Sequence, residues 1–252
     1  EFHRLEGFQP ACVTGKPVEL FGAPGREEAT GRGVARIAAA TLEKNNVKVE
    51  GATVAIQGFG NVGRYAALVC QELGMKVIAI SDVSGGIVDL KGIDIQTIFA
   101  HKTLEGVNAD ERIGSAEVLE VKCDVLIPAA LGGVINEGNM NRINAGFIIE
   151  GANQPITAIA DKELRAQGVL IVPDILANSG GVMGSYFEWT QNIQEFSWPI
   201  EKFRRELDSR MEKAFANVHK VSKKYSVDLR TAAFIVSVER VAQAFEMRGS
   251  LV

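Results

Sequence analysis

The 252-residue sequence contains few of the residues that build metal sites and disulfides, with three cysteines and three histidines. Cys12, Cys70 and Cys123 are odd in number, far apart and outside any C-x-x-C pair. We therefore expect reduced thiols, a cytoplasmic location and no metal. The histidines are equally scattered, so neither a metal cluster nor a Ser/His/Asp arrangement is visible; they are His3, His101 and His219.

Long apolar runs and an excess of positive charge are also absent. No run reaches the roughly 18 residues that span a bilayer, and the N-terminus is not a signal peptide. The net charge of −4 gives no general attraction for nucleic acid or anionic membrane, so neither is expected as a partner. A hydrophobic content of 46% suits one large core, or a main domain with an appended piece. The first methionine is Met75, so we expect a fragment or a processed product.

The segment Thr53–Asp82 has the pattern of a buried strand, a glycine-rich turn, a helix and a second strand. Gly58, Gly60 and Gly63 form G-x-G-x-x-G, where they permit a tight turn, close approach of a pyrophosphate and close helix packing. The helix N-terminus offers free N–H groups to phosphate. Asp82 follows Gly58 by 24 residues, at the end of the second strand, where a carboxylate can bind ribose hydroxyls. The pattern predicts dinucleotide binding; the alternative is a tight strand–helix turn without a ligand.

Strand-like and helix-like segments alternate through most of the chain, which predicts a wound α/β domain. Residues 83–122 are less regular, with only two short helices expected, over 93–100 and 115–119. The other predicted helices cover 25–46, 62–73, 200–225 and 229–248, and the predicted strands cover 53–57, 76–81, 124–129, 147–150 and 170–172.

Asparagines lie where several of these predicted strands end. Ligands of open parallel sheets bind beyond the carboxyl ends of the strands, where we find Asn61, Ala129, Ala130, Asn153 and Asn178. An Asn side chain supplies the donor and the acceptor that a nicotinamide carboxamide needs. Each Asn alone is better explained by its tolerance of left-handed turns, but three at successive strand ends favour a nicotinamide site.

Several longer motifs resemble the glutamate/leucine/phenylalanine/valine dehydrogenase family, in particular its C-terminal, coenzyme-binding part. They occur in the family's order from residue 14 to the last predicted helix, and the serine of SYFEW favours the glutamate branch. The motifs are TGKP (14–17), GREEATGRGV (25–34), QGFGNVG (57–63), EGAN (150–153), PDILANSGGV (173–182), SYFEWTQN (185–192) and LRTAA (229–233).

The resemblance implies roles for the matching residues. Arg26 and Thr30 would lie near the nicotinamide, Asn61 would contact pyrophosphate and ribose, and Ser185 would hold the side-chain carboxylate of the substrate. The predicted substrate-binding residues are thus Ser185 and Asn178. The predicted cofactor-binding residues are Arg26, Thr30, Gly58, Gly60, Asn61, Val62, Gly63, Asp82, Ala129, Ala130, Asn153 and Asn178.

The resemblance also implies a Rossmann-like, doubly wound, mostly parallel sheet with flanking helices, one reversed strand and a C-terminal helical extension. Residues 1–30 would connect to a missing N-terminal domain, 31–225 would bind the dinucleotide, and 226–252 would brace the missing domain. The family's catalytic lysines and aspartate belong to that domain, so no catalytic residue is expected here and the chain alone should be inactive. Lys16 is interpreted as a structural residue, and the whole protein is expected to be a homohexamer.

The implied reaction is oxidative deamination of L-glutamate to 2-oxoglutarate and ammonium with NAD or NADP. Asp82 should repel a 2′-phosphate, and no Arg or Lys lies between Ser81 and Leu90 to neutralise one, which favours NAD over NADP. Val83 replaces a common serine and removes a hydroxyl that could meet this phosphate. Two alternatives remain: a stand-alone nucleotide-binding or sensing module without catalysis, and a methyltransferase-like domain.

Overall fold

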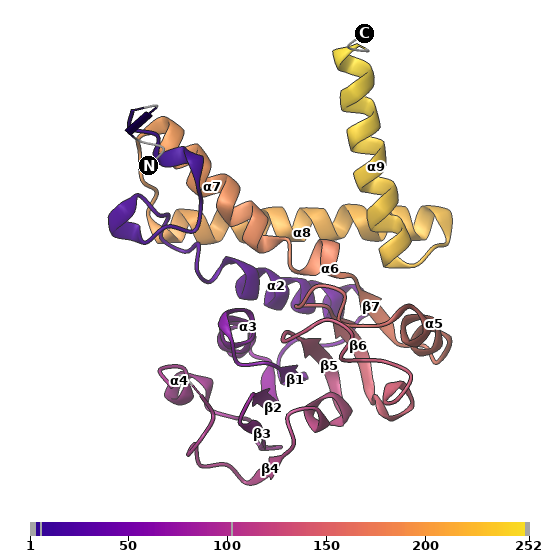
Figure 1. The fold of residues 1–252 in the computed structure, drawn as a ribbon. Coiled ribbons are helices and arrows are strands. Elements are labelled where there is room, and N and C mark those ends of the chain that lie inside the picture. The colour runs from indigo at the N-terminus through magenta and orange to yellow at the C-terminus, as the bar shows by residue number, and fades with distance from the viewer. Residues whose placement is uncertain (1–3, 6, 102, 250–252) are drawn as a thin grey trace.

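The computed structural model describes residues 4–5, 7–101 and 103–249 (Figure 1). The outermost parts of the predicted connection (1–30) and of the predicted C-terminal segment (226–252), and also His3, lie outside the described residues. The described chain forms a seven-stranded sheet in the order β4-β3-β2-β1-β5-β6-β7. The strands are β1 (Thr53–Gln57), β2 (Lys76–Asp82), β3 (Gly85–Val88), β4 (Glu111–Ile113), β5 (Cys123–Pro128), β6 (Ala145–Ile149) and β7 (Leu170–Val172).

The sheet is mostly parallel, and strands are added on both sides of β1. β1 pairs in parallel with both β2 and β5, and β6 and β7 continue the parallel arrangement. β3 alone runs against its neighbours, β2 and β4. This arrangement confirms the predicted Rossmann-like sheet and its one reversed strand. It also brings the ends of β1, β5, β6 and β7 to one edge, as the order of a doubly wound sheet requires.

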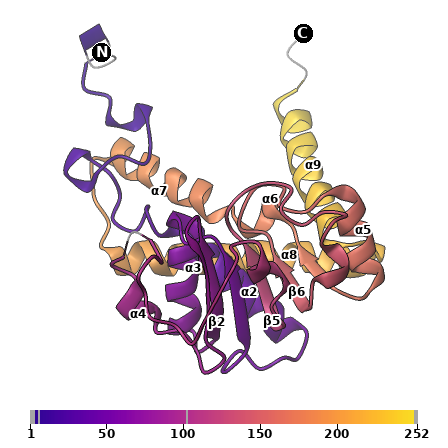
Figure 2. The ribbon, with the colours of Figure 1, turned by 60° about the horizontal axis from the view of Figure 1, so that its bottom comes forward.

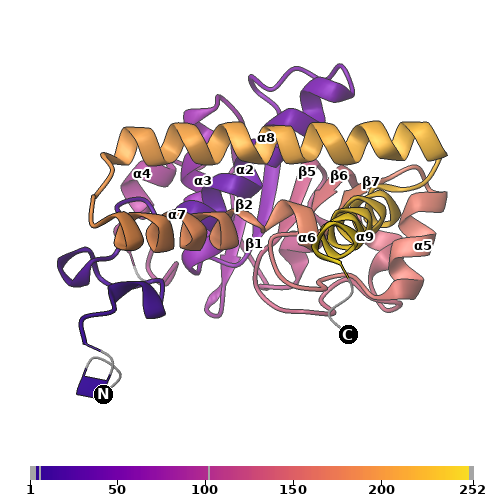
Figure 3. The same ribbon diagram turned by 90° about the horizontal axis from the view of Figure 1, so that it is seen from above.

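Helices cover both faces of this sheet. On one face α2 and α3 lie against the strands, and α7 and α8 form a further layer beyond α2 (Figures 1 and 3). On the other face α5 packs beside β7 (Figure 1). The helices are α2 (Ala29–Lys44), α3 (Asn61–Glu72), α4 (Ile95–Ile98), α5 (Ala158–Ala166), α6 (Asp174–Ala177), α7 (Gly180–Gln194), α8 (Ile200–Tyr225) and α9 (Leu229–Arg248).

Two hydrophobic cores lie on the two faces of the sheet. Successive side chains along a strand point to opposite faces, so the buried strands contribute to both cores. In β1, Val54 and Ile56 belong to the core under α2 and α3, whereas Ala55 belongs to the opposite core. β5 repeats the pattern, with Val125 and Ile127 on the first face and Leu126 on the second. Strands buried on both faces read as continuous apolar runs, which is why both segments could be recognised in the sequence.

Helix α9 differs from the other long helices because most of its length leaves the body of the molecule. It rises beyond α8 on the side where α7 also lies, and the N-terminal segment extends on the same side (Figures 1 and 2). Only its first turns are buried, through Leu229, Ala232 and Ala233. Further along α9, apolar side chains are exposed: Phe234, Val238, Val241, Phe245 and Met247. Among the described residues, no helix combines the length and the apolar character needed to cross a membrane.

Several local expectations were wrong. Helix α2 begins at Ala29 rather than at Gly25, because Gly25 has a φ of +93° and starts a turn instead. Strands β3 and β4 occupy a region where only helices were expected, and their four and three residues are too short to show a clear alternation. The predicted helix over 115–119 is a 3-10 turn, Glu117–Glu120. Helices α5 and α7 were not identified in the sequence.

Candidate functional site

A cavity of about 640 Å³ opens at the carboxyl edge of the parallel strands. It lies between the residues that follow β5 and β6 and the facing parts of α2 and α7. Eight predicted site residues line it: Arg26, Thr30, Val62, Ala129, Ala130, Asn153, Asn178 and Ser185. The structure therefore brings together residues that are more than 150 positions apart in the sequence.

A second cavity, of about 470 Å³, lies beside the glycine turn and the end of β2. It shares Ala129, Ala130 and Leu131 with the first cavity, so the two are adjacent. Gly58, Gly60 and Asp82 line it, as predicted for a dinucleotide. Together the two cavities form an elongated site at the end of the sheet, which suits a ligand with two nucleotide halves.

The glycine turn has the geometry that its sequence predicts. Gly58 has a φ of +105°, and a Cβ there would lie 3.0 Å from the backbone of Ala129. A Cβ on Gly63 would collide with the carbonyl oxygen of Gly58. A Cβ on Gly60 would meet nothing within 4 Å, so this residue faces open space at the N-terminus of α3. The fold therefore requires glycine at positions 58 and 63, whereas Gly60 leaves room for a ligand beside the helix N-terminus.

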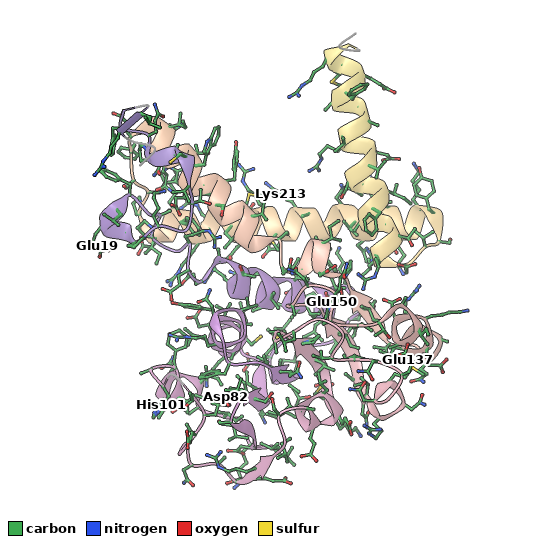
Figure 4. All side chains as sticks on the ribbon, viewed as in Figure 1. Glu19, Asp82, His101, Glu137, Glu150 and Lys213 are labelled. Atoms are coloured by element: carbon green, nitrogen blue, oxygen red, sulfur yellow. The ribbon has the colours of Figure 1, made fainter. Side chains whose placement is uncertain are left out.

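Asp82, which is labelled in Figure 4, already accepts hydrogen bonds within the chain. Its Oδ1 accepts from the Ser84 N–H at 2.7 Å and the Ser84 hydroxyl at 2.6 Å, and its Oδ2 accepts from the Leu104 N–H at 2.6 Å. Partial burial acts to raise the pKa of Asp82, but these hydrogen bonds outweigh it and lower the pKa. The carboxylate is thus ionised at neutral pH. Val83, where a serine is common, is 98% exposed, and the hydroxyl near the acid comes from Ser84 instead.

A buried polar atom in the second cavity supports a ligand there. Gln57, the last residue of β1, lines the cavity, and its Oε1 is buried without a hydrogen-bond partner in the described part of the chain. Buried acceptors are normally satisfied. This atom was not predicted from the sequence, although Gln57 directly precedes the glycine turn.

Arg26 and Ser185 meet in the first cavity. The Nε of Arg26, just before α2, donates to Oγ of Ser185 in α7 at 3.0 Å. Gly181 makes the approach of α7 possible, because a Cβ there would lie 2.5 Å from the hydroxyl oxygen of Thr30. The resemblance gave Arg26 and Thr30 to the cofactor and Ser185 to the substrate, and the hydrogen bond joins these two groups.

Asn153 and Asn178 also pair. The Nδ2 of Asn178 donates to Oδ1 of Asn153 at 2.8 Å and to the carbonyl oxygen of Gly151 at 3.3 Å. The Nδ2 of Asn153 donates to none of the described residues. Both side chains line the cavity. Two coupled amides with open edges can present a donor and an acceptor to a carboxamide.

Two predicted cofactor residues do not line either cavity. The Nδ2 of Asn61 donates to the carbonyl oxygen of Glu27 at 2.8 Å, which ties the start of α3 to the turn before α2. Gly63 packs α3 against the glycine turn. In this structure both residues therefore fix the position of α3 and do not line either cavity.

Lys16 forms an ion pair with Glu188. Its Nζ bonds Oε1 of Glu188 at 2.5 Å and the Val13 carbonyl oxygen at 2.6 Å. Glu188, in α7, also accepts from the backbone N–H groups of Gly15 and Lys16. Burial acts to raise the pKa of Glu188, yet its three hydrogen bonds and the charge of Lys16 lower it overall. The ion pair fastens the N-terminal segment to α7.

Other lining residues were not singled out in the sequence. They are Leu131, Gly132, Gly151, Ala152, Gly181 and Val182 in the first cavity, and Phe59, Thr103, Ser115 and Val134 in the second. Several belong to the recognised EGAN and NSGGV motifs, which was the available signal.

The first cavity has hydrogen-bonding groups but little acid–base capacity. Arg26 is the one ionisable side chain among the described residues that line it, and an arginine does not release its proton in proteins. The site can therefore bind and orient a dinucleotide, but moving protons at an amino carbon requires a further group.

The fold and this site define a dinucleotide-binding α/β domain of the kind found in dehydrogenases. A profile of the Glutamate/Leucine/Phenylalanine/Valine dehydrogenase family matches residues 22–249. The chain therefore belongs to this family, which confirms the resemblance and favours a dehydrogenase part over the two alternatives.

Its relatives agree in sequence and in structure. The chain is 50% identical over 242 residues to glutamate dehydrogenase of Thermotoga maritima, a match that covers 94% of the chain and 58% of the relative. The hetero-hexameric glutamate dehydrogenase of Thermus thermophilus superposes with a TM-score of 0.89 at 31% identity, over 96% of this chain and 58% of that one. The enzyme of Peptoniphilus asaccharolyticus gives 0.82 at 34% identity, over 95% and 57%. The chain thus spans less than two thirds of these relatives' length.

Proposed function

We propose that this chain is the coenzyme-binding part of a glutamate dehydrogenase that converts L-glutamate to 2-oxoglutarate and ammonium. The observation that carries the proposal is the pair of adjacent cavities, in which the glycine turn and the paired asparagines share one edge of the sheet. The pyrophosphate would lie at Gly60 and the α3 N-terminus, and the adenosine ribose at Asp82. The nicotinamide would lie among Thr30, Asn153 and Asn178.

The bound nicotinamide would supply the hydride acceptor. This chain's residues would orient it: Thr30 and the Asn153–Asn178 pair offer hydrogen bonds to a carboxamide, and Arg26 lies alongside. Ser185 would hold the side-chain carboxylate of the amino acid at the same cavity wall, with Asn178 as a second contact. The contact between Arg26 and Ser185 supports this placement, because it puts the substrate residue directly beside the cofactor residues.

We infer that the coenzyme is NAD rather than NADP. Asp82 is ionised, since its pKa is lowered, and a nearby carboxylate repels a 2′-phosphate. None of the described residues lining this cavity is a lysine or an arginine. Oδ2 of Asp82 accepts one hydrogen bond, from Leu104, and so keeps a lone pair for a hydroxyl of an unphosphorylated ribose.

The missing N-terminal domain would cover the open side of the first cavity. In α7, Val182, Tyr186, Trp189 and Ile193 are exposed at helical spacing, and α9 adds a similar exposed row. Patches of this kind mark interaction surfaces. The two helices that carry these rows, α7 and α9, lie on the same side of the sheet (Figure 1). Residues 1–30 would thus connect the two domains and 226–252 would brace them, while 31–225 would form the dinucleotide-binding domain. The whole protein would assemble as a homohexamer.

The division of labour is tested by recombination. The chain alone should give no detectable reduction of NAD or NADP with saturating L-glutamate, because the cavity lacks an acid–base group and its opposite wall. General acid–base catalysis contributes ~10²–10⁴-fold, and orientation contributes more. Addition of the separately produced upstream part of the same protein should restore turnover. Robust turnover by the chain alone would contradict the proposal.

A further inference from the structure

Arg230 lies in the first turn of α9 and faces three carboxylates from three other elements. Its Nη2 lies 2.6 Å from Oε1 of Glu150 and 3.2 Å from Oδ2 of Asp161. Its Nη1 lies 3.4 Å from Oδ1 of Asp174. These acids follow β6, lie in α5 and begin α6, respectively. The guanidinium therefore ties the first turn of α9 to the ends of β6 and β7.

Glu150 depends on this arginine. Its side chain is 0% exposed, and its position is visible in Figure 4. Burial raises the pKa of Glu150, and the hydrogen bond and charge of Arg230 oppose that effect. A buried carboxylate that loses its partner is strongly unfavourable, so loss of Arg230 would leave Glu150 without its charged partner at 2.6 Å.

The same acids hold the loop that carries Asn153. Oε2 of Glu150 accepts the backbone N–H of Asp174 at 2.7 Å. Oδ2 of Asp174 accepts the N–H of Gln154 at 2.8 Å. Gln154 has a φ of +47°, a conformation that side chains other than glycine rarely adopt. The loop 151–153 is thus anchored on both sides by groups that contact Arg230.

We propose that Arg230 is a positioning residue for the nicotinamide half of the coenzyme, an inference that rests on the function proposed above. Among the described residues, Arg230 forms no hydrogen bond or ion pair with those that line the first cavity. It acts by holding Glu150 and Asp174, which set the path of 151–154 and so the partnership of Asn153 with Asn178. Since Arg230 belongs to α9, the shape of the nicotinamide site depends on the position of this helix.

A neighbouring arginine provides a matched control. Arg165 in α5 pairs with Asp161 at 2.6 Å and with Asp228, the N-cap of α9, at 3.0 Å. It belongs to the same charged cluster and fastens the same helix, but within the described part of the chain it forms no ion pair or hydrogen bond with Glu150 or Asp174. Arg165→Met therefore removes an ion pair of the cluster without releasing the loop.

The test compares two ligands on the 252-residue chain by calorimetry. ADP-ribose contains the adenosine and pyrophosphate part, and NADH adds the nicotinamide. In Arg230→Met we expect NADH to bind about tenfold more weakly, as for the loss of a hydrogen bond, while ADP-ribose binds within about twofold of wild type. Arg165→Met should leave both unchanged. Arg230→Lys keeps the charge beside Glu150 but lacks the fork that also reaches Asp174, so it should fold like wild type and weaken NADH alone by about threefold.

The outcomes separate the two proposals. Unchanged NADH binding in Arg230→Met, or equal weakening of both ligands in Arg230→Lys, would overturn the positioning role while leaving the dinucleotide site intact. If Arg230→Met does not fold, Arg230→Lys decides the question by the same comparison. A wild-type chain that binds neither NADH nor ADP-ribose would overturn the proposed function, and the positioning role with it.

Discussion

The Nε of Arg26 and Oγ of Ser185 lie 3.0 Å apart, although 159 positions separate them in the sequence. The contact joins the turn before α2 to the second turn of α7, at the wall of the larger cavity. A residue proposed to hold the substrate is thereby fixed against a residue proposed to lie beside the nicotinamide.

Substitution of Ser185 should affect the choice of amino acid. In the protein rejoined to its upstream part, Ser185→Ala should lower kcat/KM for L-glutamate by about tenfold or more, because a hydrogen bond to a carboxylate is lost. The rate with norvaline, which has no side-chain carboxylate, should change little. Thr190→Ala is the control, since that hydroxyl bonds only its own helix at the Tyr186 carbonyl oxygen. Equal losses for glutamate and norvaline would contradict the role of Ser185.

Asp82 should set the coenzyme preference. The wild-type chain should bind NAD more tightly than NADP, and Asp82→Ser should narrow the gap by about tenfold as the repulsive charge is removed. Dissociation constants for both coenzymes provide the measurement. Asp89→Ser is the matched control, because Asp89 follows β3 and, among the described residues, its carboxylate accepts only the N–H of Lys91. A wild-type chain that prefers NADP would rule out this explanation.

The Lys16–Glu188 pair should stabilise the chain in a pH-dependent manner. The pKa of Glu188 in the folded chain lies below its ordinary value of 4.5. The unfolded chain therefore binds the proton more readily, so the stabilisation is complete above about pH 4.5 and is lost as the pH falls through the folded pKa. At pH 7, Glu188→Gln should reduce the free energy of unfolding by about 1–3 kcal/mol.

Thermal melts at several pH values check this prediction. For a chain of this size, the expected loss corresponds to a Tm lowered by about 2–4 °C per kcal/mol. The difference between wild type and variant should shrink at acidic pH. Glu19→Gln, on an exposed side chain of the same N-terminal segment (Figure 4), should change neither value. A constant difference at all pH values would show that the charge of Glu188 is not the cause.

The sequence predicted the central part of the fold because its elements are long or buried on both faces. β1, β5 and α8 combine such patterns with clear ends. β3 and β4 could not be recognised in this way, since four and three residues are too few to show the alternation of buried and exposed side chains. Helix α7 begins with Gly180 and Gly181, which are poor helix formers, and tertiary packing against Thr30 explains the helix there.

The candidate site could be predicted where a residue type or motif had a chemical reason. Gly58, Asp82, Asn153 and Asn178 belong to this group, and the cavities contain all four. Contacts between distant residues could not be predicted, because their partners are set by the packing of helices. The bonds from Lys16 to Glu188 and from Arg230 to Glu150 are examples.

The most direct test of dinucleotide binding by this chain is a calorimetric titration of NADH into wild type and Gly60→Val. Gly60 has a φ of −74°, and a Cβ there meets nothing in the described chain within 4 Å, so the variant should melt as cooperatively as wild type. Its side chain would instead occupy the space beside the α3 N-terminus where a pyrophosphate would lie. We predict that wild type binds NADH and that Gly60→Val shows no detectable binding. A folded Gly60→Val chain that binds NADH like wild type would contradict the account, because the glycine turn would then not be the phosphate site.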